Sequence, residues 1–211
     1  MDAATVLTDI QLASQALWRA GVAGGIEKFD GGDLQEKVAA AYWPLTDAAL
    51  TLTTWRFNTV TRKLSQLASP PPSRWAYRYT LPGDRLGEPY AIFFDQDKTA
   101  GTQNFEIFED ELWCDEPIAF ALYQRRPTSP GKWSPIFRDF VMTDLAAVLA
   151  LDINQDRSRY QTLKIEAYGS LDANAFGGKL ALAVQREAMT LPPVQALPDG
   201  GPLVRARLGG D

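Results

Sequence analysis

The chain of 211 residues contains no histidine and a single cysteine, Cys114. The lack of histidine excludes Ser-His-Asp and Cys-His nucleophile sites and His-rich zinc sites. One cysteine leaves no internal disulfide, no CxxC redox pair and no cysteine zinc cluster. Neither GxGxxG nor GxxxxGK[ST] occurs, so the usual nucleotide-binding loops are missing. An enzyme would have to use carboxylates, Lys, Tyr or Ser, and we expect no catalytic residue, no cofactor and no metal.

The chain also lacks long apolar runs and a strong positive charge. No run is long enough to span a bilayer, and residues 1–6 lack the basic-then-apolar layout of a signal peptide. We therefore expect no membrane partner, and the lone cysteine suits a reducing cytosol. Apolar residues make up 45% of the chain, enough for a core, and the formal net charge is −5. That charge argues against a protein that coats nucleic acid, but it is compatible with one past which DNA slides.

The N-terminal part has helical periodicity. Residues 5–20 carry one row of side chains at helical spacing, and glycines at 21–25 end the segment: Leu7, Ile10, Ser14, Leu17 and Trp18. Asp33 followed by Glu36 predicts an N-cap with a capping box. The helix after it has an apolar stripe at three- to four-residue spacing: Leu34, Val38, Ala41, Leu45, Ala48 and Leu52. Pro44 lies inside this helix and should kink it.

Between residues 56 and 132 the period changes to two. Trp75, Tyr77, Tyr79 and Leu81 would share one face of a strand. Further strands are expected at 90–94 and 118–125, with a hairpin over 104–114 whose tip is Glu109-Asp110-Glu111. This pattern predicts a small antiparallel β module.

Helical spacing returns near residue 134. Ser134 is a candidate N-cap and Pro135 suits the first helical position of a mostly buried helix that runs to 151. A last helix is expected over 156–176, closed by Gly177-Gly178. The predicted fold class is α+β. It is an antiparallel bundle of about four helices (1–55 and 133–178) with an inserted antiparallel β module (56–132) and an extended C-terminal arm (179–211).

The predicted arm has an unusual composition. From Leu180 onward it has no aromatic residue, and four prolines after residue 191 block helix. Residues 203–208, Leu-Val-Arg-Ala-Arg-Leu, interleave apolar and cationic side chains. Composition alone leaves two interpretations equally open: an arm that binds a partner surface, or a fraying terminus.

One acidic run is a candidate site. Six carboxylates lie within a short stretch that has no Lys or Arg: Glu106, Glu109, Asp110, Glu111, Asp115 and Glu116. Paired carboxylates can hydrolyse glycosides, and clusters can bind a hard cation such as calcium, although the EF-hand glycine spacing is missing. A solvated turn is the favoured interpretation. The functional alternative is that Glu109, Asp110 and Glu111 face a channel or the next tail component and repel DNA phosphate.

An aromatic group and a basic group come next. The aromatic side chains could stack nucleic-acid bases, although a strand core is favoured: Trp75, Tyr77, Tyr79, Tyr90, Phe93 and Phe94. The basic residues could cover a solvated strand face or contact an acidic neighbouring subunit: Arg56, Arg62, Lys63, Arg74 and Arg78.

Three sequence patterns together resemble a known family. They are Asp47-Ala48-Ala49-Leu50, then Trp55-Arg56-Phe57, then Trp75-x-Tyr77-x-Tyr79-x-Leu81-Pro82-x-Asp84. They are similar to patterns in the head-to-tail adaptor proteins of tailed phages, namely the tail tubular protein A group of podophages and the adaptors of gene transfer agents. The resemblance covers roughly residues 7–176, and its motifs are structural rather than catalytic.

The resemblance implies an assembly role without enzymatic activity. Such proteins form a ring, usually a dodecamer, beneath the portal, and the ring lines the DNA channel without specific binding to the double-stranded DNA. The far side docks the next tail component, a stopper or nozzle protein. The expected location is the virion neck, after assembly in the host bacterial cytoplasm. The implied portal-binding residues are Pro202, Leu203, Val204, Arg205, Arg207 and Leu208.

Two functions from other classes remain open at this point. One is a carboxylate-based hydrolase of cell-wall glycan, with Glu106 or Glu111 as the acid. The other is a small single-stranded nucleic-acid-binding module built on the face that carries Trp75 and Tyr79.

Overall fold

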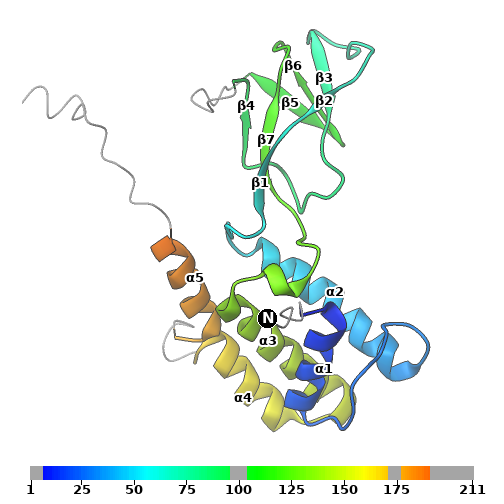
Figure 1. Ribbon diagram of the computed structural model, residues 1–211, viewed down its shortest axis with the longest axis vertical. Helices are drawn as coiled ribbons and strands as arrows, with labels where there is room; N and C mark the ends of the chain where they lie inside the picture. Colours follow the sequence, from blue (N-terminus) through cyan, green and yellow to red (C-terminus); the bar gives the residue numbers. More distant parts are fainter. Residues whose placement is uncertain (1–6, 96–103, 171–176, 191–211) are drawn as a thin grey trace, which may run out of the picture.

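The computed structural model describes residues 7–95, 104–170 and 177–190. These ranges hold five α-helices and seven β-strands, which confirms the expected α+β class. In chain order they are α1 (Asp9–Ala20), α2 (Asp33–Thr51), β1 (Thr59–Lys63), β2 (Ser65–Gln66), β3 (Tyr77–Thr80), β4 (Ala91–Phe93), β5 (Phe105–Phe108), β6 (Glu111–Cys114), β7 (Phe120–Gln124), α3 (Pro135–Asn154), α4 (Arg157–Tyr168) and α5 (Lys179–Thr190). The helices gather at one end of the molecule and the strands at the other (Figure 1).

Helix α3 is the centre of the helical end. It packs against all of the other four described helices, and this explains why it is apolar around most of its circumference. Its start is as predicted, because the Ser134 side chain accepts a hydrogen bond from the Phe137 N–H and Pro135 occupies the first helical position. Phe137, Phe140 and Leu145 are fully buried in the core that α3 shares with its neighbours.

The starts of α1 and α2 differ from the prediction. The capping box belongs to α1, where Thr8 and Gln11 exchange side-chain-to-backbone hydrogen bonds. The predicted box at Asp33 is wrong, because α2 begins one residue earlier with Gly32 as its N-cap and without a side-chain cap. Asp33 therefore lies inside the first turn, where a carboxylate still interacts favourably with the helix dipole.

The buried faces of α1 and α2 differ in part from those predicted. In α1, Ser14 and Leu17 of the predicted row are buried, but Trp18 is 60% exposed. The other buried side chains of α1 are Leu12, Ala13, Ala16 and Ala20. In α2 the buried set is Val38, Tyr42, Thr46, Ala49 and Leu50. Of the predicted α2 stripe only Val38 is buried, and Ala48 and Leu52 are exposed. Pro44 is exposed, and α2 continues through it to Thr51.

The strands form two antiparallel sheets, with orders β1-β7-β4 and β2-β3-β6-β5. The predicted hairpin is present, since β5 pairs with β6 and Phe108 lies opposite Glu111. The predicted alternation around β3 is confirmed in part, since Trp75, Tyr79 and Leu81 are buried and Ala76 and Thr80 are exposed, while Tyr77 and Arg78 are both half-buried. A second core of nine buried side chains lies between the sheets: Leu64, Tyr79, Leu81, Ile92, Leu112, Cys114, Ala119, Ala121 and Tyr123.

The two ends of the molecule are joined where α2 ends. The last carbonyls of a helix have no partner within the helix. Here the Leu50 carbonyl accepts hydrogen bonds from the side-chain amides of Asn58 at 3.1 Å and Gln124 at 3.0 Å. The indole of Trp55 donates to the Ala49 carbonyl at 3.0 Å. All three donors are buried, so the end of α2 is capped by the residues that lead into and out of the sheets.

The C-terminal part requires a correction. Helix α4 ends at Tyr168, eight residues before the predicted end at Phe176, because Gly169 caps it. Residues 179–190, predicted to begin an extended arm, form α5. Residues 191–211, which we call the C-terminal segment, lie outside the described residues. Among the helices that the structure describes, none is long and apolar enough to cross a membrane.

Gly178 determines how α5 follows α4. A Cβ atom at this position would lie 2.4 Å from the Gly169 nitrogen and 2.5 Å from the Ala167 oxygen. Those atoms belong to the end of α4, whose backbone cannot retreat without breaking the turn. Only glycine therefore allows the chain to pass this close before α5 begins.

Replacing Gly178 with alanine should lower the free energy of unfolding by about 1–3 kcal/mol, because the added methyl group overlaps backbone atoms. Urea denaturation followed by circular dichroism measures the change. Gly83→Ala is the matched control, since a Cβ there meets nothing within 4 Å, and it should stay within about 0.5 kcal/mol of the wild type. Equal effects of the two substitutions would contradict the close approach.

Alkaline pH should destabilise the β module through Tyr79. Its hydroxyl donates to the Glu116 carbonyl at 2.7 Å, and burial raises its pKa from 10.0 to about 12. The folded state thus favours the neutral phenol, so this contribution to stability is complete below pH 10 and is lost as pH rises from 10 towards 12.

The Tyr79→Phe variant should be about 1 kcal/mol less stable at pH 7, because a hydrogen bond is missing. Its free energy of unfolding should fall less steeply than that of the wild type between pH 10 and 12. Denaturation curves recorded at several pH values give the slope of the unfolding free energy against pH for each protein. Equal slopes for the two proteins would argue against a raised pKa of Tyr79.

Candidate functional site

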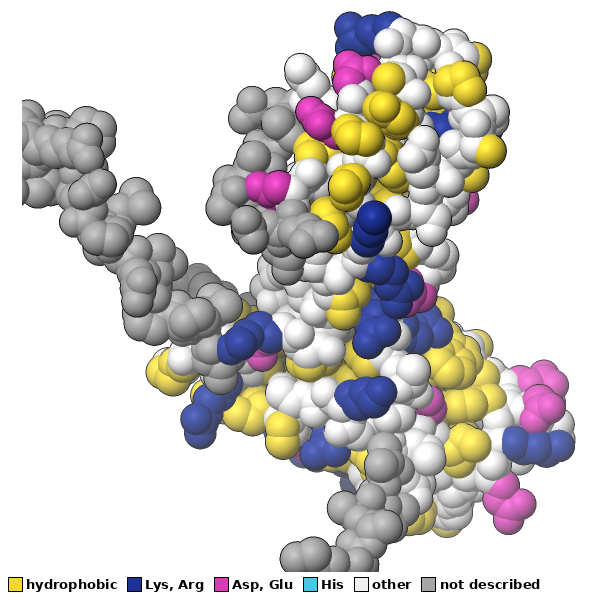
Figure 2. Space-filling view, turned by 45° about the horizontal axis from the view of Figure 1, so that its top comes forward, with side chains coloured by type: hydrophobic (Ala, Val, Ile, Leu, Met, Phe, Trp, Pro, Cys, Tyr) yellow, Lys and Arg dark blue, Asp and Glu magenta, His cyan; other side chains and the backbone are white. Residues whose placement is uncertain are grey.

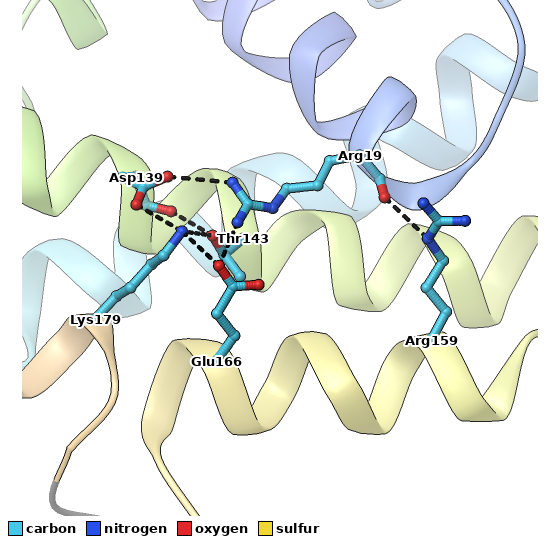
Figure 3. Close-up of polar contacts among 6 residues, drawn as sticks. All are labelled: Arg19, Asp139, Thr143, Arg159, Glu166 and Lys179. Atoms are coloured by element: carbon cyan, nitrogen blue, oxygen red, sulfur yellow. Dashed lines mark hydrogen bonds and ion pairs between the residues drawn. The ribbon is translucent and has the colours of Figure 1, made fainter.

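A polar cluster at the base of α5 joins four helices (Figure 3). Its centre is Lys179, the first residue of α5, whose side chain is only 16% exposed. The Lys179 Nζ lies 2.5 Å from Asp139 Oδ2 and 3.0 Å from Glu166 Oε1. It also donates to Thr143 Oγ1 at 2.9 Å. Lys179 therefore ties α5 to both α3 and α4.

Arg19 from α1 completes this cluster. Its Nη1 lies 3.2 Å from Asp139 Oδ1, and its Nη2 lies 2.5 Å from Glu166 Oε1. Two cations and two carboxylates therefore alternate, and each carboxylate is shared by both cations. We call Arg19, Asp139, Glu166 and Lys179 the four-helix charge cluster. Beside it, Arg159 Nε donates to the Arg19 carbonyl at 3.0 Å (Figure 3).

The partial burial of the cluster determines what it contributes. The carboxylates of Asp139 and Glu166 are 44% and 40% exposed, so solvent weakens each individual pair. Lys179 and its Thr143 partner are well covered, so their hydrogen bonds cannot be replaced easily by water. The main effect is geometric, because four helices must hold one arrangement to satisfy every charge.

A separate carboxylate, which is buried, supports α4. Asp144 on α3 is 5% exposed and accepts hydrogen bonds from Lys164 Nζ at 2.5 Å and from the Tyr168 hydroxyl at 2.8 Å. Burial raises the pKa of Tyr168, and the hydrogen bond to Asp144 raises it further. Both partners of Asp144 lie on α4, so this contact fixes the helix that precedes α5.

The remainder of α5 is held by two further contacts. Ala183 is buried against the helical core. Near the end of α5, the Glu187 carboxylate accepts a hydrogen bond from the Arg56 backbone N–H, at the start of the sheet region. Contacts along the length of α5 thus fix the point from which the C-terminal segment leaves. The predicted portal-binding residues, 202–208, lie within that segment and outside the described residues.

The acidic run and the basic group, predicted separately, meet each other. Glu106 accepts from the Trp75 indole at 2.8 Å and pairs with Arg74 at 3.4 Å. Glu111 pairs with Arg78 at 3.5 Å and accepts from the adjacent Trp113 indole at 2.9 Å. The two candidate glycosidase acids are therefore engaged in contacts that hold the sheet together.

The tip of the acidic run is a tight turn. Glu109 has a φ of 52°, in the left-handed region, and it is exposed with Asp110. Asp110 pairs with Arg85 at 2.6 Å, which ties the turn to the loop before β4. Among the described residues, no group of three or more His, Cys, Asp or Glu side chains could hold a metal ion.

The core interpretation of the aromatic group is confirmed in part, since Tyr79 lies in the core of the β module and Tyr77 and Phe94 pack against it. Trp75 and Tyr79 are 6% and 2% exposed, so their ring faces are not open to stacking bases. Tyr90 is half exposed, and its hydroxyl donates to the Gln124 side chain. In the basic group, Arg62 lies 3.6 Å from Asp84, so it too faces an acid of its own chain.

The four-helix charge cluster is what sequence reasoning missed. Arg19 is 120 positions from Asp139 and 147 positions from Glu166. No local motif connects residues so distant in the chain. The sequence prediction assigns Lys179 to an extended arm, and an extended segment gives no reason to expect that Lys179 anchors a helix to α3 and α4. Its only sequence signal is a cation at the beginning of an amphipathic stretch, 179–190, directly after two glycines.

Comparison with known proteins adds no assignment. A scan of protein-family models finds no match to the chain, and a search of curated proteins finds none either.

Replacing Lys179 with methionine should loosen α5. The side chain keeps its length but loses the charge shared by Asp139 and Glu166, so the free energy of unfolding should fall by about 1–3 kcal/mol. Urea denaturation measures the loss, and limited proteolysis should show faster cleavage between α4 and α5. Lys132→Met removes an exposed lysine outside the cluster and serves as the control, while Lys179→Arg should retain most of the stability.

Proposed function

We propose that this chain is a non-enzymatic head-to-tail adaptor of a tailed phage or phage-like particle. In this proposal several copies form a ring below the portal, with a dodecamer expected, and join the capsid portal to the tail. The ring surrounds the DNA channel without binding a specific sequence. The sequence resemblance at residues 47–50, 55–57 and 75–84 is the starting point of the proposal.

The observation that carries the proposal is the fixed mounting of α5. Lys179, Gly178 and Glu187 hold this helix against the bundle, and it projects at one edge of the helical end (Figure 1). A segment of 21 residues, 191–211, follows it. An adaptor needs such an arrangement, because a binding peptide must leave the ring at the same place and angle in every copy.

The composition of the C-terminal segment suits binding to a large surface. Ordering a backbone costs about 1–2 kcal/mol per residue, so extensive contacts are needed to offset it. In the proposed complex Arg205 and Arg207 pair with acidic residues of the portal. Leu203, Val204 and Leu208 fill apolar pockets there, and Pro202 limits the freedom of the unbound chain.

The charge pairing in the β module supports a surface that does not bind DNA tightly. Arg74, Arg78 and Arg85 pair with carboxylates of the same chain, which leaves these cations less able to bind phosphate. A wall with paired cations and exposed acids such as Glu109 would let DNA pass without gripping it. In this proposal the strand end docks the next tail component.

Deletion of residues 202–211 should leave a folded protein that no longer joins portal-containing capsids. Cosedimentation with capsids that carry the cognate portal measures the joining, and circular dichroism checks the fold. The double substitution Arg205→Glu and Arg207→Glu should weaken binding at least tenfold through charge repulsion. The matched control Glu109→Gln with Asp110→Asn should bind as the wild type does. Normal joining by the truncated protein would refute the proposal.

A further inference from the structure

Two hollows on the helical end carry complementary features. The first, about 650 Å³, lies between α5 and the start of α3. Its apolar walls are Pro135, Ile136, Leu182 and Met189, and the cation Arg186 lies at its side. Leu182 and Met189 are 52% and 68% exposed. We call this surface the α5 face.

The four-helix charge cluster makes the α5 face a preformed surface. Asp139 and Lys179 belong to both the cluster and the lining of the hollow. The ion pair at 2.5 Å between them fixes the two walls relative to each other. A partner that enters this hollow would therefore lose little free energy to ordering of the receiving side.

The second hollow lies beside α1 and also measures about 650 Å³. Trp18, 60% exposed, forms one side, and Ile10 and the loop residues Gly25 to Glu27 form others. We call this surface the α1 face. An exposed tryptophan at a hollow is the residue type that most often anchors protein interfaces.

The α1 face is preformed as well. The buried hydroxyl of Ser14 accepts a hydrogen bond from the Ile26 N–H at 3.1 Å and donates one to the Ile26 carbonyl at 3.2 Å. These two bonds hold the glycine-rich loop against α1. A Cβ at Gly25 would lie 3.1 Å from Ser14 Oγ and 3.9 Å from Trp18, so glycine lets the loop lie flat there.

The charges around the two faces are opposite in sign. Residues 27–36 contain four acids, Glu27, Asp30, Asp33 and Glu36, and one lysine, which gives a net charge of −3. The α5 face has Arg186 at its side, with the exposed Lys132 just before α3. Figure 2 shows acidic side chains gathered at the edge of the helical end that lies farthest from α5.

The two faces are formed by different elements and share no lining residue. In Figure 1, α5 projects from one edge of the helical end and the loop between α1 and α2 forms the opposite edge. Two different complementary surfaces produce head-to-tail contacts, and repetition of such a contact closes a ring when the rotation permits.

We infer that the α1 face of one copy docks into the α5 face of a second copy, with Trp18 in the hollow between Leu182 and Ile136 and with Arg186 opposite Glu27. The inference rests on the proposed ring, because it names the contact between neighbouring subunits. The contact is apolar at its centre and charged at its edge, the usual anatomy of a specific interface.

Sedimentation velocity of the full chain over a range of concentrations tests this contact. The wild type should self-associate, and Trp18→Ala and Leu182→Asp should each raise the dissociation constant at least tenfold. Ile165→Ala is the matched control, since Ile165 is a large apolar side chain on α4, 54% exposed and outside both faces. Unchanged association of the Trp18 variant, or a wild type that stays monomeric at the highest concentration, would overturn the inference.

A mixing experiment tests the head-to-tail geometry. The Trp18→Ala variant keeps its α5 face and the Leu182→Asp variant keeps its α1 face. A mixture of the two should form a 1:1 dimer that grows no further, although each variant alone is monomeric. Arg186→Glu and Glu27→Arg should each weaken association, and the double variant should restore it. A mixture that stays monomeric would refute head-to-tail docking.

Deletion of residues 191–211 separates this inference from the proposed portal contact. The deleted protein should self-associate like the full chain, because both faces lie within the described residues. Loss of association on deletion would mean that the C-terminal segment occupies the α5 face, and the inference would be wrong. Failure of the full chain to join capsids, with self-association intact, would reject the adaptor function alone.

Discussion

The arrangement of the helical end depends on the charge shared by Arg19, Asp139, Glu166 and Lys179. Each carboxylate contacts two cations, so none of α1, α3, α4 and α5 can shift without leaving a charge with fewer partners. Hydrophobic packing around α3 supplies most of the stability, but such packing tolerates small rotations of a helix. The charge cluster removes that tolerance and gives α5 one position. Both the departure of the C-terminal segment and the walls of the α5 face follow from that position.

The strand end uses charge differently. In the helical end, cations and acids converge from four helices on one point. In the sheets they pair locally across neighbouring segments, as Arg78 does with Glu111 and Arg85 with Asp110. Such pairs add little free energy, because Asp110 is exposed and the Arg78 and Glu111 side chains are still partly open to solvent. Each pair cancels charge locally on the surface of the sheets, although the chain as a whole keeps a net charge of −5. The indole N–H groups of Trp75 and Trp113 donate hydrogen bonds to Glu106 and Glu111, and these bonds orient the two carboxylates.

The sequence predicted features that rest on local physics. The Ser134 cap, the hairpin around Glu109 and the alternation around β3 depend on neighbouring residues; the first two are present, and the alternation is present in part. The predicted start of α2 is wrong by one residue, because an aspartate is favourable both at the N-cap and within the first turn of a helix. The predicted face of α1 is right for Ser14 and Leu17 and wrong for Trp18, which is apolar yet exposed, a fact that only the tertiary structure reveals. Helix α5 was missed because the prolines after residue 191 favour an extended chain, and the prediction extended that structure back to residue 179. The charge cluster joins residues more than a hundred positions apart, a distance over which a single sequence carries no signal.

The joint at the end of α2 has a mechanical consequence. Asn58 and Gln124 flank the entry to and the exit from the sheets, and both amides bond to the Leu50 carbonyl beneath the buried Trp55. Two strand connections bonded to one helix end resist bending more than a single linker would. A pull on the strand end would load these buried bonds together. The molecule should therefore transmit force along its long axis as a strut, with a constant separation between its two cores.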